Sequence, residues 1–432
     1  MDHGKLRTRL WTVPSISAML GIPSTGVETL ADASNLAPIP ILDLKEQYKL
    51  YGAQLEQTII EILRSGHFIL GENVARLEKD VAEFCGVKHG IAVANGTDAL
   101  ELALWAADVG PGDEVITPPF TFAATAEAIA LRGATPVFVD VDPNSFNINT
   151  DLIEKAITSR TKAIMPVHLY GQAANMEPVV RLAQKHGLKI IEDNAQAIGA
   201  MQGARSTGSF GDMACISFYP TKNLGAAGDA GMIVTNDDAL AERLRAVRAH
   251  GMRKRYYHDE LGRNSRLDEI QAAVLLAKLP YLRDWNSRRN QVAKWYDEAL
   301  KHCPGIITPT VLRGNTHVWH QYTIRVNTGS TNTEDDARLR DELVAELAQR
   351  RISSMCYYPV PLHMQEAFSS YGYRRGDFVV SERLAAQVLS LPMYPELSKE
   401  QVERVAAAIT EIMTAKVAVS PSVVPSSFIT GI

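Results

Sequence analysis

Residues 213–225 read MACISFYPTKNLG, an apolar run that passes into a turn with a lysine and then into the glycine-rich segment 225–231. The apolar part predicts a buried strand. Lys222 therefore stands at the end of a strand, whereas an ordinary surface lysine has polar neighbours on a helix. Because burial disfavours the ammonium form, such an amine can act as a nucleophile near neutral pH. Taken alone, Lys222 is better explained as an ordinary loop lysine than as a nucleophile. The residues around it in the fold decide between these two interpretations.

Strand-like and helical patterns alternate on both sides of this stretch. Seven short apolar runs predict strands at residues 90–94, 114–117, 136–139, 163–167, 189–192, 214–217 and 232–235. Helical spacing predicts helices between most of them, at 97–107, 121–131 and 177–186. Uninterrupted apolar strands that alternate with helices form mostly parallel sheets covered on both faces. The chain is therefore predicted to be an α/β protein with a mostly parallel seven-stranded sheet.

The sequence pattern divides the whole chain into four predicted regions. They are an N-terminal extension that we expect to be flexible (1–40), helices followed by the large α/β domain (41–250), linker helices with a smaller α+β domain (251–415), and a flexible tail rich in serine and proline (416–432). In the third region, residues 321–326 resemble a strand, and helical patterns cover 337–350, 381–389 and 399–413.

Composition narrows the class of protein. With 46% hydrophobic and 22% charged residues, the chain has the composition of a soluble enzyme, and its net charge of −5 provides no basic field for nucleic acid. The basic cluster at 250–255 is short enough to be a solvated loop, although an anionic substrate could use it. Four widely spaced cysteines and the lack of a long apolar run indicate a cytoplasmic protein that spans no membrane.

Two histidines, His317 and His320, stand three residues apart. No cysteine or carboxylate nearby completes a zinc shell around them. We therefore expect no metal site.

Residues just beyond the predicted strands are candidates for a site, because ligands of open parallel sheets bind at the carboxyl ends of the strands. After the first strand come Gly96 and Thr97, whose backbone N–H groups at a helix N-terminus could hold a phosphate. A simple strand-to-helix turn would also explain them. After the second strand comes Phe122, which could stack on a planar cofactor or pack under a loop.

The fifth and sixth strands add charged and polar groups. Asp193 follows a buried strand, where a carboxylate is costly without a positive partner such as a protonated pyridine nitrogen. It could instead be a structural carboxylate that caps the next turn. Gln196 could donate to a ring hydroxyl, and Ser217 to a phosphate. With Lys222 as the Schiff-base amine, the set predicts a pyridoxal phosphate site.

Several longer motifs can now be compared with a known family. They are VGPGDEVI at 109–116, TFAAT at 121–125, VHLYG at 167–171, EDNAQ at 192–196, SFYPTKNLG at 217–225, GRNSRLD at 262–268 and PLH at 361–363. The set resembles the DegT/DnrJ/StrS aminotransferases, from about Ile41 to about Ala415. The resemblance implies a fold-type I subunit, similar to aspartate aminotransferase, that works as a homodimer and transaminates nucleotide-linked ketosugars with L-glutamate as amino donor.

The resemblance also implies a role for individual residues. Lys222 would form the imine with pyridoxal 5'-phosphate and Asp193 would pair with its ring nitrogen. The other assignments are Gln196 to the ring hydroxyl, Phe122 to the ring face, Gly96, Thr97 and Ser217 to the phosphate, Asn264 to the phosphate in the partner subunit's site, and Tyr219, Tyr358 and His363 to the sugar.

Details of the reaction stay open in the sequence. Residues 218–226 look more like family members that aminate C3 of the sugar than those that aminate C4. A sugar phosphate or an aminocyclitol ketone could replace the nucleotide sugar. A regulatory or sensor protein that binds pyridoxal phosphate without catalysis, or a decarboxylase or aldolase with the same cofactor, would have the same fold. The intact lysine, aspartate and glutamine favour the aminotransferase over the regulatory protein, and the decarboxylase or aldolase stays an alternative.

Overall fold

The computed structural model describes residues 37–419, and the predicted extension before residue 37 and tail after residue 419 lie outside the described residues. The described residues from Pro38 to residue 419 belong to one compact unit. Within the described part, no helix is both long and apolar enough to cross a membrane.

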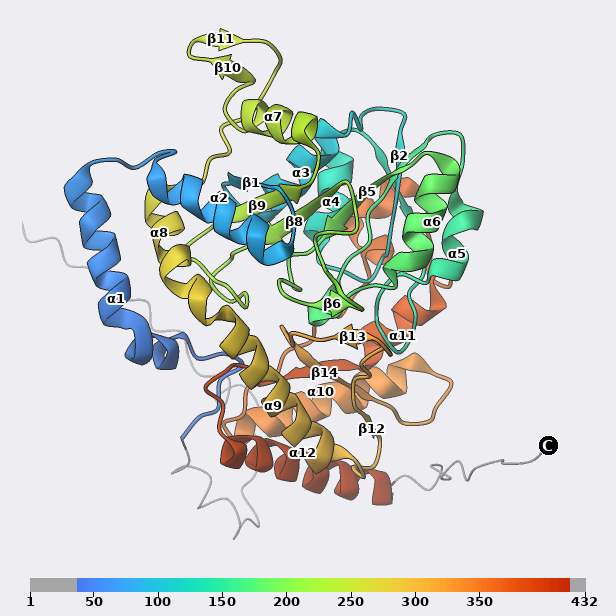
Figure 1. Ribbon diagram of the computed structural model, residues 1–432. Coiled ribbons are helices and arrows are strands. Elements are labelled where there is room, and N and C mark those ends of the chain that lie inside the picture. Colours follow the sequence, from blue (N-terminus) through green and yellow to red (C-terminus); the bar gives the residue numbers. More distant parts are fainter. Residues whose placement is uncertain (1–36, 420–432) are drawn as a thin grey trace, which may run out of the picture. The chain divides into compact units, whose positions relative to one another are not determined.

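The central sheet has seven strands in the order β1-β9-β8-β5-β4-β2-β3 (Figure 1). Their bounds are β1 (His89–Val93), β2 (Glu114–Thr117), β3 (Thr135–Phe138), β4 (Thr161–Ile164), β5 (Lys189–Asp193), β8 (Met213–Ser217) and β9 (Gly231–Thr235). Neighbouring strands pair in parallel from β8 to β3, whereas β9 runs antiparallel to both β8 and β1. The predicted mostly parallel seven-stranded sheet is confirmed, with every strand within three residues of its predicted position.

Helices cover both faces of this sheet. One face carries α3 (Gly96–Ala106), α4 (Ala123–Leu131) and α7 (Asp238–Val247), and the other carries α2 (Glu72–Cys85), α5 (Thr150–Ala156), α6 (Met176–His186) and α8 (Glu269–Lys278). Strand β8 illustrates why both faces of the sheet are covered. Met213 and Cys215 pack in the core on the first face, whereas Ala214 and Ile216 pack in the core on the second. A strand buried on both sides needs an unbroken apolar run.

The C-terminal part has its own core. A three-stranded antiparallel sheet joins β12 (Ile306–Ile307), β14 (Tyr322–Val326) and β15 (Val388–Leu391), and it packs with α9 (Leu282–Leu300), α10 (Thr333–Gln349) and α12 (Lys399–Val419). The sequence predicted one helix over 381–389. Here α11 (Val379–Gln387) ends where β15 begins, because residues 388–391 pair with β14.

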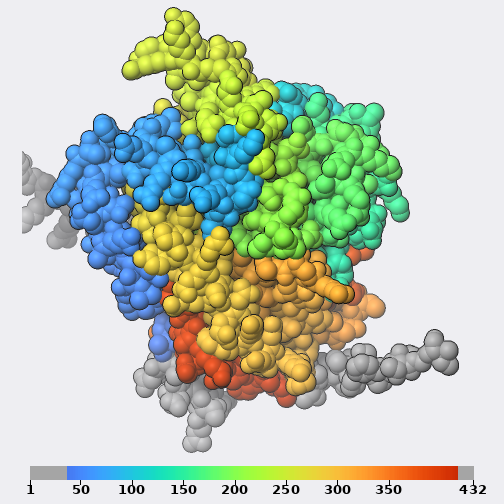
Figure 2. Space-filling view, in the orientation of Figure 1, coloured from blue at the N-terminus to red at the C-terminus, as the bar shows by residue number. Residues whose placement is uncertain are grey.

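Two further small sheets complete the fold. The first joins β6 (Met201–Gln202), β7 (Arg205–Ser206) and β13 (Asn315–Thr316), and so links the large sheet's connections to the C-terminal part. The second is the hairpin β10 (Met252–Lys254) with β11 (Tyr257–His258), which begins in the basic cluster at 250–255 and extends beyond it. Figures 1 and 2 show this hairpin extending away from α7. The side chains of Tyr256 and Tyr257 are exposed.

Helix α1 (Leu44–Ser65) precedes α2 and contacts α8. Its C-terminus is closed by Gly66 in the left-handed conformation, whose N–H donates to the carbonyl of Ile62. The helices predicted ahead of the large α/β domain are α1 and α2, which a short connection separates.

Candidate active site

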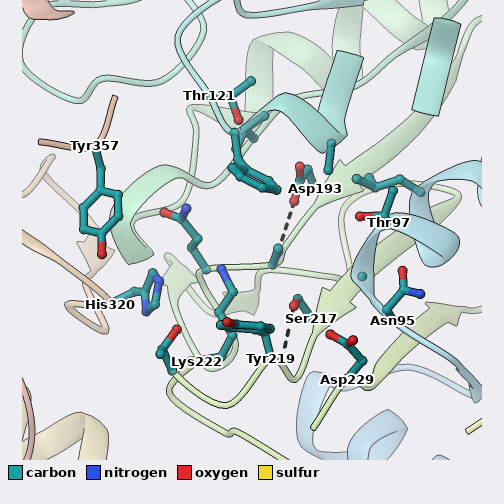
Figure 3. A pocket seen from close by; sticks show the side chains of 18 of the residues that line it. Asn95, Thr97, Thr121, Asp193, Ser217, Tyr219, Lys222, Asp229, His320 and Tyr357 are labelled. Atoms are coloured by element: carbon teal, nitrogen blue, oxygen red, sulfur yellow. Dashed lines mark hydrogen bonds between the residues drawn. The ribbon is translucent and has the colours of Figure 1, made fainter. Parts of the chain in front are cut away.

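A cavity of about 820 Å³ opens at the carboxyl ends of β1, β5 and β8 (Figure 3). These three strands run in the same direction, so the residues that follow them meet at one edge of the sheet. Of the eleven residues predicted from the sequence, nine line the cavity: Gly96, Thr97, Phe122, Asp193, Gln196, Ser217, Tyr219, Lys222 and Tyr358. The cavity thus gathers residues that are far apart in the chain.

Lys222 stands on a tight turn that β8 delivers to the cavity. Its N–H donates to the carbonyl of Tyr219 at 2.8 Å, and the N–H of Ala226 closes the turn by donating to the carbonyl of Phe218 at 2.8 Å. Burial lowers the pKa of Lys222 to about 8, against the charge of Asp193, which raises it. The neutral amine is therefore available near physiological pH, as a nucleophilic lysine requires.

Asp193 ends β5 and is almost completely buried. The hydroxyl of Thr125 donates to Oδ2 at 2.7 Å, and the N–H of Ala195 donates to Oδ1 at 3.2 Å. Burial raises the pKa of Asp193, and these hydrogen bonds and the charge of Lys222 oppose that rise. Because both hydrogen-bond donors are neutral, the carboxylate has capacity for a cationic N–H group at the cavity.

The N-terminus of α3 forms the opposite end of the cavity. The side chain of Asn95 accepts from the N–H of Asp98 at 2.8 Å, while the N–H groups of Gly96 and Thr97 belong to the first turn and have no intrahelical acceptor. A Cβ at Gly96 would stand 2.7 Å from the Cβ of Ser217. Glycine therefore keeps open a polar cradle of backbone N–H and hydroxyl groups, which suits a phosphate.

The side chains between these two ends are polar or aromatic. Gln196 accepts from the N–H of Tyr170 at 2.7 Å and donates to the hydroxyl of Tyr358 at 3.2 Å. Phe122 follows β2 and exposes its ring at the cavity, 6.0 Å from that of Tyr358. Tyr219 is also exposed at the rim.

Two predicted residues lie elsewhere. His363 is buried outside the cavity, where its Nε2 lies 3.0 Å from Oε1 of Glu382 and its ring packs against Phe378. The prediction that it faces the sugar is not supported within one subunit, because these neighbours enclose it. Asn264 is exposed and also outside the cavity, and the sequence assigned it to the site of a second subunit.

Several other residues of the cavity wall were not predicted from the sequence. They are Asn95, Thr121, Asp229, His320, Gln321 and Tyr357. Thr121 and Tyr357 adjoin predicted site residues, so extending each motif by one position would have found them. His320 follows β13 and not a strand of the large sheet. It was therefore not predicted, because the candidates were residues at the carboxyl ends of the strands of that sheet.

The cavity fits pyridoxal phosphate in its chemistry. It provides a cradle for an anion, an exposed aromatic ring, a buried carboxylate with only neutral donors and a lysine of lowered pKa. These groups match the phosphate, the ring face, the pyridinium nitrogen and the aldehyde of that cofactor. Fold and cavity together define a fold-type I enzyme that depends on pyridoxal phosphate.

Comparison with known proteins identifies the family. Residues 50–410 match the model of the DegT/DnrJ/EryC1/StrS aminotransferase family, and the chain belongs to this family. The chain is 50% identical to the "pleiotropic regulatory protein" of Geobacillus stearothermophilus, over 86% of this chain and 98% of the relative. It is 48% identical to the UDP-N-acetyl-3-dehydro-alpha-D-glucosamine 3-aminotransferase of Acidithiobacillus ferrooxidans, over 86% and 97%.

Solved structures agree with this assignment. The crystal structure of DesV from S. venezuelae, in complex with a ketimine intermediate, is similar with a TM-score of 0.83 and 43% identity, covering 87% of this chain and 98% of that one. NtdA from Bacillus subtilis, with bound cofactor PMP, is similar with a TM-score of 0.79 and 32% identity, covering 88% and 86%. The predicted aminotransferase activity, fold type and cofactor are confirmed at the level of the family.

Proposed function

We propose that this protein transfers the amino group of L-glutamate to the C3 keto group of a nucleotide-linked ketosugar. One observation carries the proposal. A single cavity contains the Lys222 amine, the buried Asp193 carboxylate and the anion cradle at the N-terminus of α3. Bound pyridoxal phosphate supplies an electron sink that lets an amino group and a proton leave one substrate and enter another.

Lys222 would hold the cofactor through Nζ, and the same amine would act as the base that moves a proton during the transfer. Its pKa of about 8 suits both tasks, because a general base works best when its pKa lies near the working pH. Asp193 would keep the ring nitrogen protonated by pairing with it. The hydrogen bond from Gln196 to Tyr358 orients both side chains at the cavity wall, where the ring hydroxyl would lie.

The choice of C3 is supported by the names of relatives. Besides the Acidithiobacillus enzyme, they include the UDP-2-acetamido-2-deoxy-3-oxo-D-glucuronate aminotransferase of Pseudomonas aeruginosa, at 42% identity, and the dTDP-3-amino-3,6-dideoxy-alpha-D-galactopyranose transaminase of Aneurinibacillus thermoaerophilus, at 46%. Each name places the reaction at position 3, with UDP or dTDP as carrier. L-Glutamate as donor rests on the family resemblance.

We further propose that the working enzyme is a homodimer in the cytoplasm whose subunits share their active sites. Asn264, predicted to contact the phosphate of the partner subunit's site, is exposed next to the base of the β10–β11 hairpin. Residues Phe68, Ile69 and Leu70, between α1 and α2, also expose large apolar side chains. Such surfaces are typical of protein interfaces.

A regulatory role is the second candidate, because the Geobacillus relative bears the name of a regulatory protein. A regulator would bind the cofactor without needing an amine of lowered pKa. The intact pair of Lys222 and Asp193 favours catalysis.

Spectroscopy of the purified protein, loaded with pyridoxal phosphate, separates these candidates. We expect L-glutamate to convert the cofactor's absorbance band to that of the amine form and to release 2-oxoglutarate in a stoichiometric amount. A ketosugar should then restore the first band. A protein that binds the cofactor but never converts it with L-glutamate or other amino acids would be regulatory. Conversion without any response to ketosugars would contradict the proposed acceptor.

A further inference from the structure

His320 is one of the cavity-wall residues that the proposed chemistry leaves without a task. It lies between β13 and β14 and is only 7% exposed, yet it borders the cavity next to Lys222. In the view of Figure 3 the imidazole lies between the side chains of Tyr357 and Lys222, at the end of the cavity away from Asn95 and Thr97. It therefore faces the part of the cavity that the phosphate cradle does not use.

The backbone holds this imidazole in place from two sides. Arg289, which is buried, donates from Nη1 to the carbonyl of Trp319 at 2.9 Å. On the other side, a Cβ at Gly171 would stand 2.9 Å from the backbone nitrogen of His320, and Gly171 has φ +107°. Trp319 itself has φ +48°, which costs energy for a bulky residue. The backbone position of His320 is thus held before any ligand arrives.

The imidazole has unused hydrogen-bonding capacity. Its Nδ1 is buried and has no hydrogen-bond partner in the part of the chain that the structure describes. Burial lowers the pKa of His320 well below its usual value, and the charges of Lys222 and Arg289 lower it further. The ring is therefore neutral, with one nitrogen that donates a hydrogen bond and one that accepts.

The neighbouring His317 shows what a structural histidine looks like in the same segment. Its Nδ1 accepts from the N–H of Trp319 at 2.9 Å, and its ring stacks on that of Trp319 with centroids 3.8 Å apart. His317 is buried outside the cavity wall. Within residues 37–419, Nδ1 of His320 has no hydrogen-bond partner and its ring stacks on no other ring, so packing alone does not account for His320.

We propose that His320 is a binding residue for the amino acceptor and forms a hydrogen bond with a hydroxyl group of the sugar. A hydroxyl both donates and accepts, which matches a neutral imidazole, whereas the carboxylates of an amino-acid donor only accept and bind best to cations. The inference rests on the proposed function. It adds that His320 contributes to the binding of the sugar and is not needed for the reaction with L-glutamate.

Two variants of His320 and one control test this assignment in the enzyme loaded with cofactor. His320→Phe keeps a ring but removes the hydrogen bonds, and His320→Gln restores a donor and an acceptor. His317→Asn is the control, because it alters a buried histidine of the same segment outside the cavity. Calorimetry measures binding of UDP-N-acetylglucosamine and dTDP-glucose as non-reacting probes, and absorbance follows the half-reaction with L-glutamate.

We expect His320→Phe to weaken binding of the sugar nucleotide about 10- to 100-fold, as the loss of a buried hydrogen bond predicts. His320→Gln should recover part of this loss, and both variants should convert with L-glutamate at a rate within about threefold of the wild type. His317→Asn should change sugar-nucleotide binding and the rate of the L-glutamate half-reaction to the same degree, or change neither.

Other outcomes overturn the assignment. Unchanged sugar-nucleotide binding in His320→Phe would mean that the imidazole is structural. An equal loss in the L-glutamate half-reaction would mean that it serves both substrates. If the wild type converts with L-glutamate but binds neither sugar nucleotide, the proposed substrate class fails and the role of His320 with it.

Discussion

Lys222 and Asp193 respond in opposite directions to the same environment. Removal from water favours the neutral form of either group, so it lowers the pKa of the amine and raises that of the carboxylate. For Lys222 this is the useful state, because the neutral amine is the nucleophile. For Asp193 it is an unfavourable one, which a cationic ring nitrogen would relieve. The apo site is therefore arranged for a ligand that brings its own positive charge.

Replacing Lys222 with alanine is expected to abolish turnover, because no other amine lines the cavity among residues 37–419. The variant should still bind the cofactor through its phosphate and ring, but without the absorbance band of the covalent form. Steady-state assays and absorbance spectra measure the two effects. Lys185→Ala, an exposed lysine on α6, is the control and should behave as the wild type. Full activity in Lys222→Ala would contradict the assignment.

The pKa of Lys222 gives a prediction for the cofactor-free protein. Below pH 8 the amine is mostly protonated, so the rate of covalent uptake of pyridoxal phosphate should rise about tenfold per pH unit and level off above about pH 8. Stopped-flow absorbance between pH 6 and pH 10 measures this rate. A rate that keeps rising toward pH 10.5, the ordinary pKa of lysine, would show that the amine is not desolvated.

Asp193→Ala is expected to lower the turnover rate by several orders of magnitude, because the ring nitrogen loses its anionic partner. The protein should keep its cofactor through Lys222 and the phosphate cradle, which absorbance can verify. Thr125→Val, which removes the neutral hydrogen bond to Oδ2 and the hydrogen bond between the Thr125 and Thr121 hydroxyls, should lose far less. A loss of less than about tenfold in Asp193→Ala, or about 1.4 kcal/mol of barrier, would mean that the carboxylate has another role.

At the scale of elements, the junction between α2 and α8 depends on one buried carboxylate. Glu269 starts α8 and accepts from the N–H groups of Gly71, Asn73 and Val74 at 2.7, 3.1 and 2.9 Å, and from the side chain of Asn73 at 2.9 Å. It thus caps the N-terminus of α2, which has no side-chain cap of its own. Two helices almost 200 residues apart are joined by this contact.

Glu269→Ala is expected to lower the free energy of unfolding by about 3 kcal/mol, because it leaves buried donors without an acceptor. Urea unfolding at a fixed protein concentration measures the change. Glu72→Ala, an exposed acidic residue in the first turn of α2, is the control and should stay within about 0.5 kcal/mol of the wild type. A similarly small change in Glu269→Ala would show that water replaces the carboxylate at the helix end.

Elements of the large sheet could be predicted because each carries a signal within its own sequence. Strand β8 is an unbroken apolar run, and Asp193 and Ser217 could be selected because they follow such runs directly. Strand β15 could not, because residues 388–391 continue the pattern of α11 and become a strand only by pairing with β14. The capping by Glu269 and the approach of His320 to Lys222 also depend on contacts between distant segments, which local patterns do not reveal.

At the scale of the whole molecule, the surface of a single subunit shows features that a second copy would explain. Leu261 and Tyr256, on the hairpin segment, are 83% and 76% exposed, and Phe68 to Leu70 expose three adjacent apolar side chains. Asn264 lies at the base of the same segment, paired through its backbone with Ala249. A twofold-symmetric dimer would use each such surface twice, once in each subunit.

Mixing two inactive variants tests whether subunits share their sites. Lys222→Ala disables a site through its own subunit, and Asn264→Ala should disable the site of the partner. In a hybrid dimer, the site that contains Lys222 also receives an intact Asn264 from the other subunit. Co-expression of the two variants should therefore restore about a quarter of the wild-type activity, because half of the dimers are hybrids and each has one complete site.

The expected control is that each variant alone is dimeric by sedimentation and nearly inactive. Hybrids made with two copies of Lys222→Ala, differing only in an affinity tag, should show no recovery. If the mixed variants form dimers but stay inactive, Asn264 acts within its own subunit, which its position outside the cavity argues against. If the wild-type protein is an active monomer, the exposed apolar surfaces serve some other partner, and the cavity of one subunit must be sufficient for the reaction.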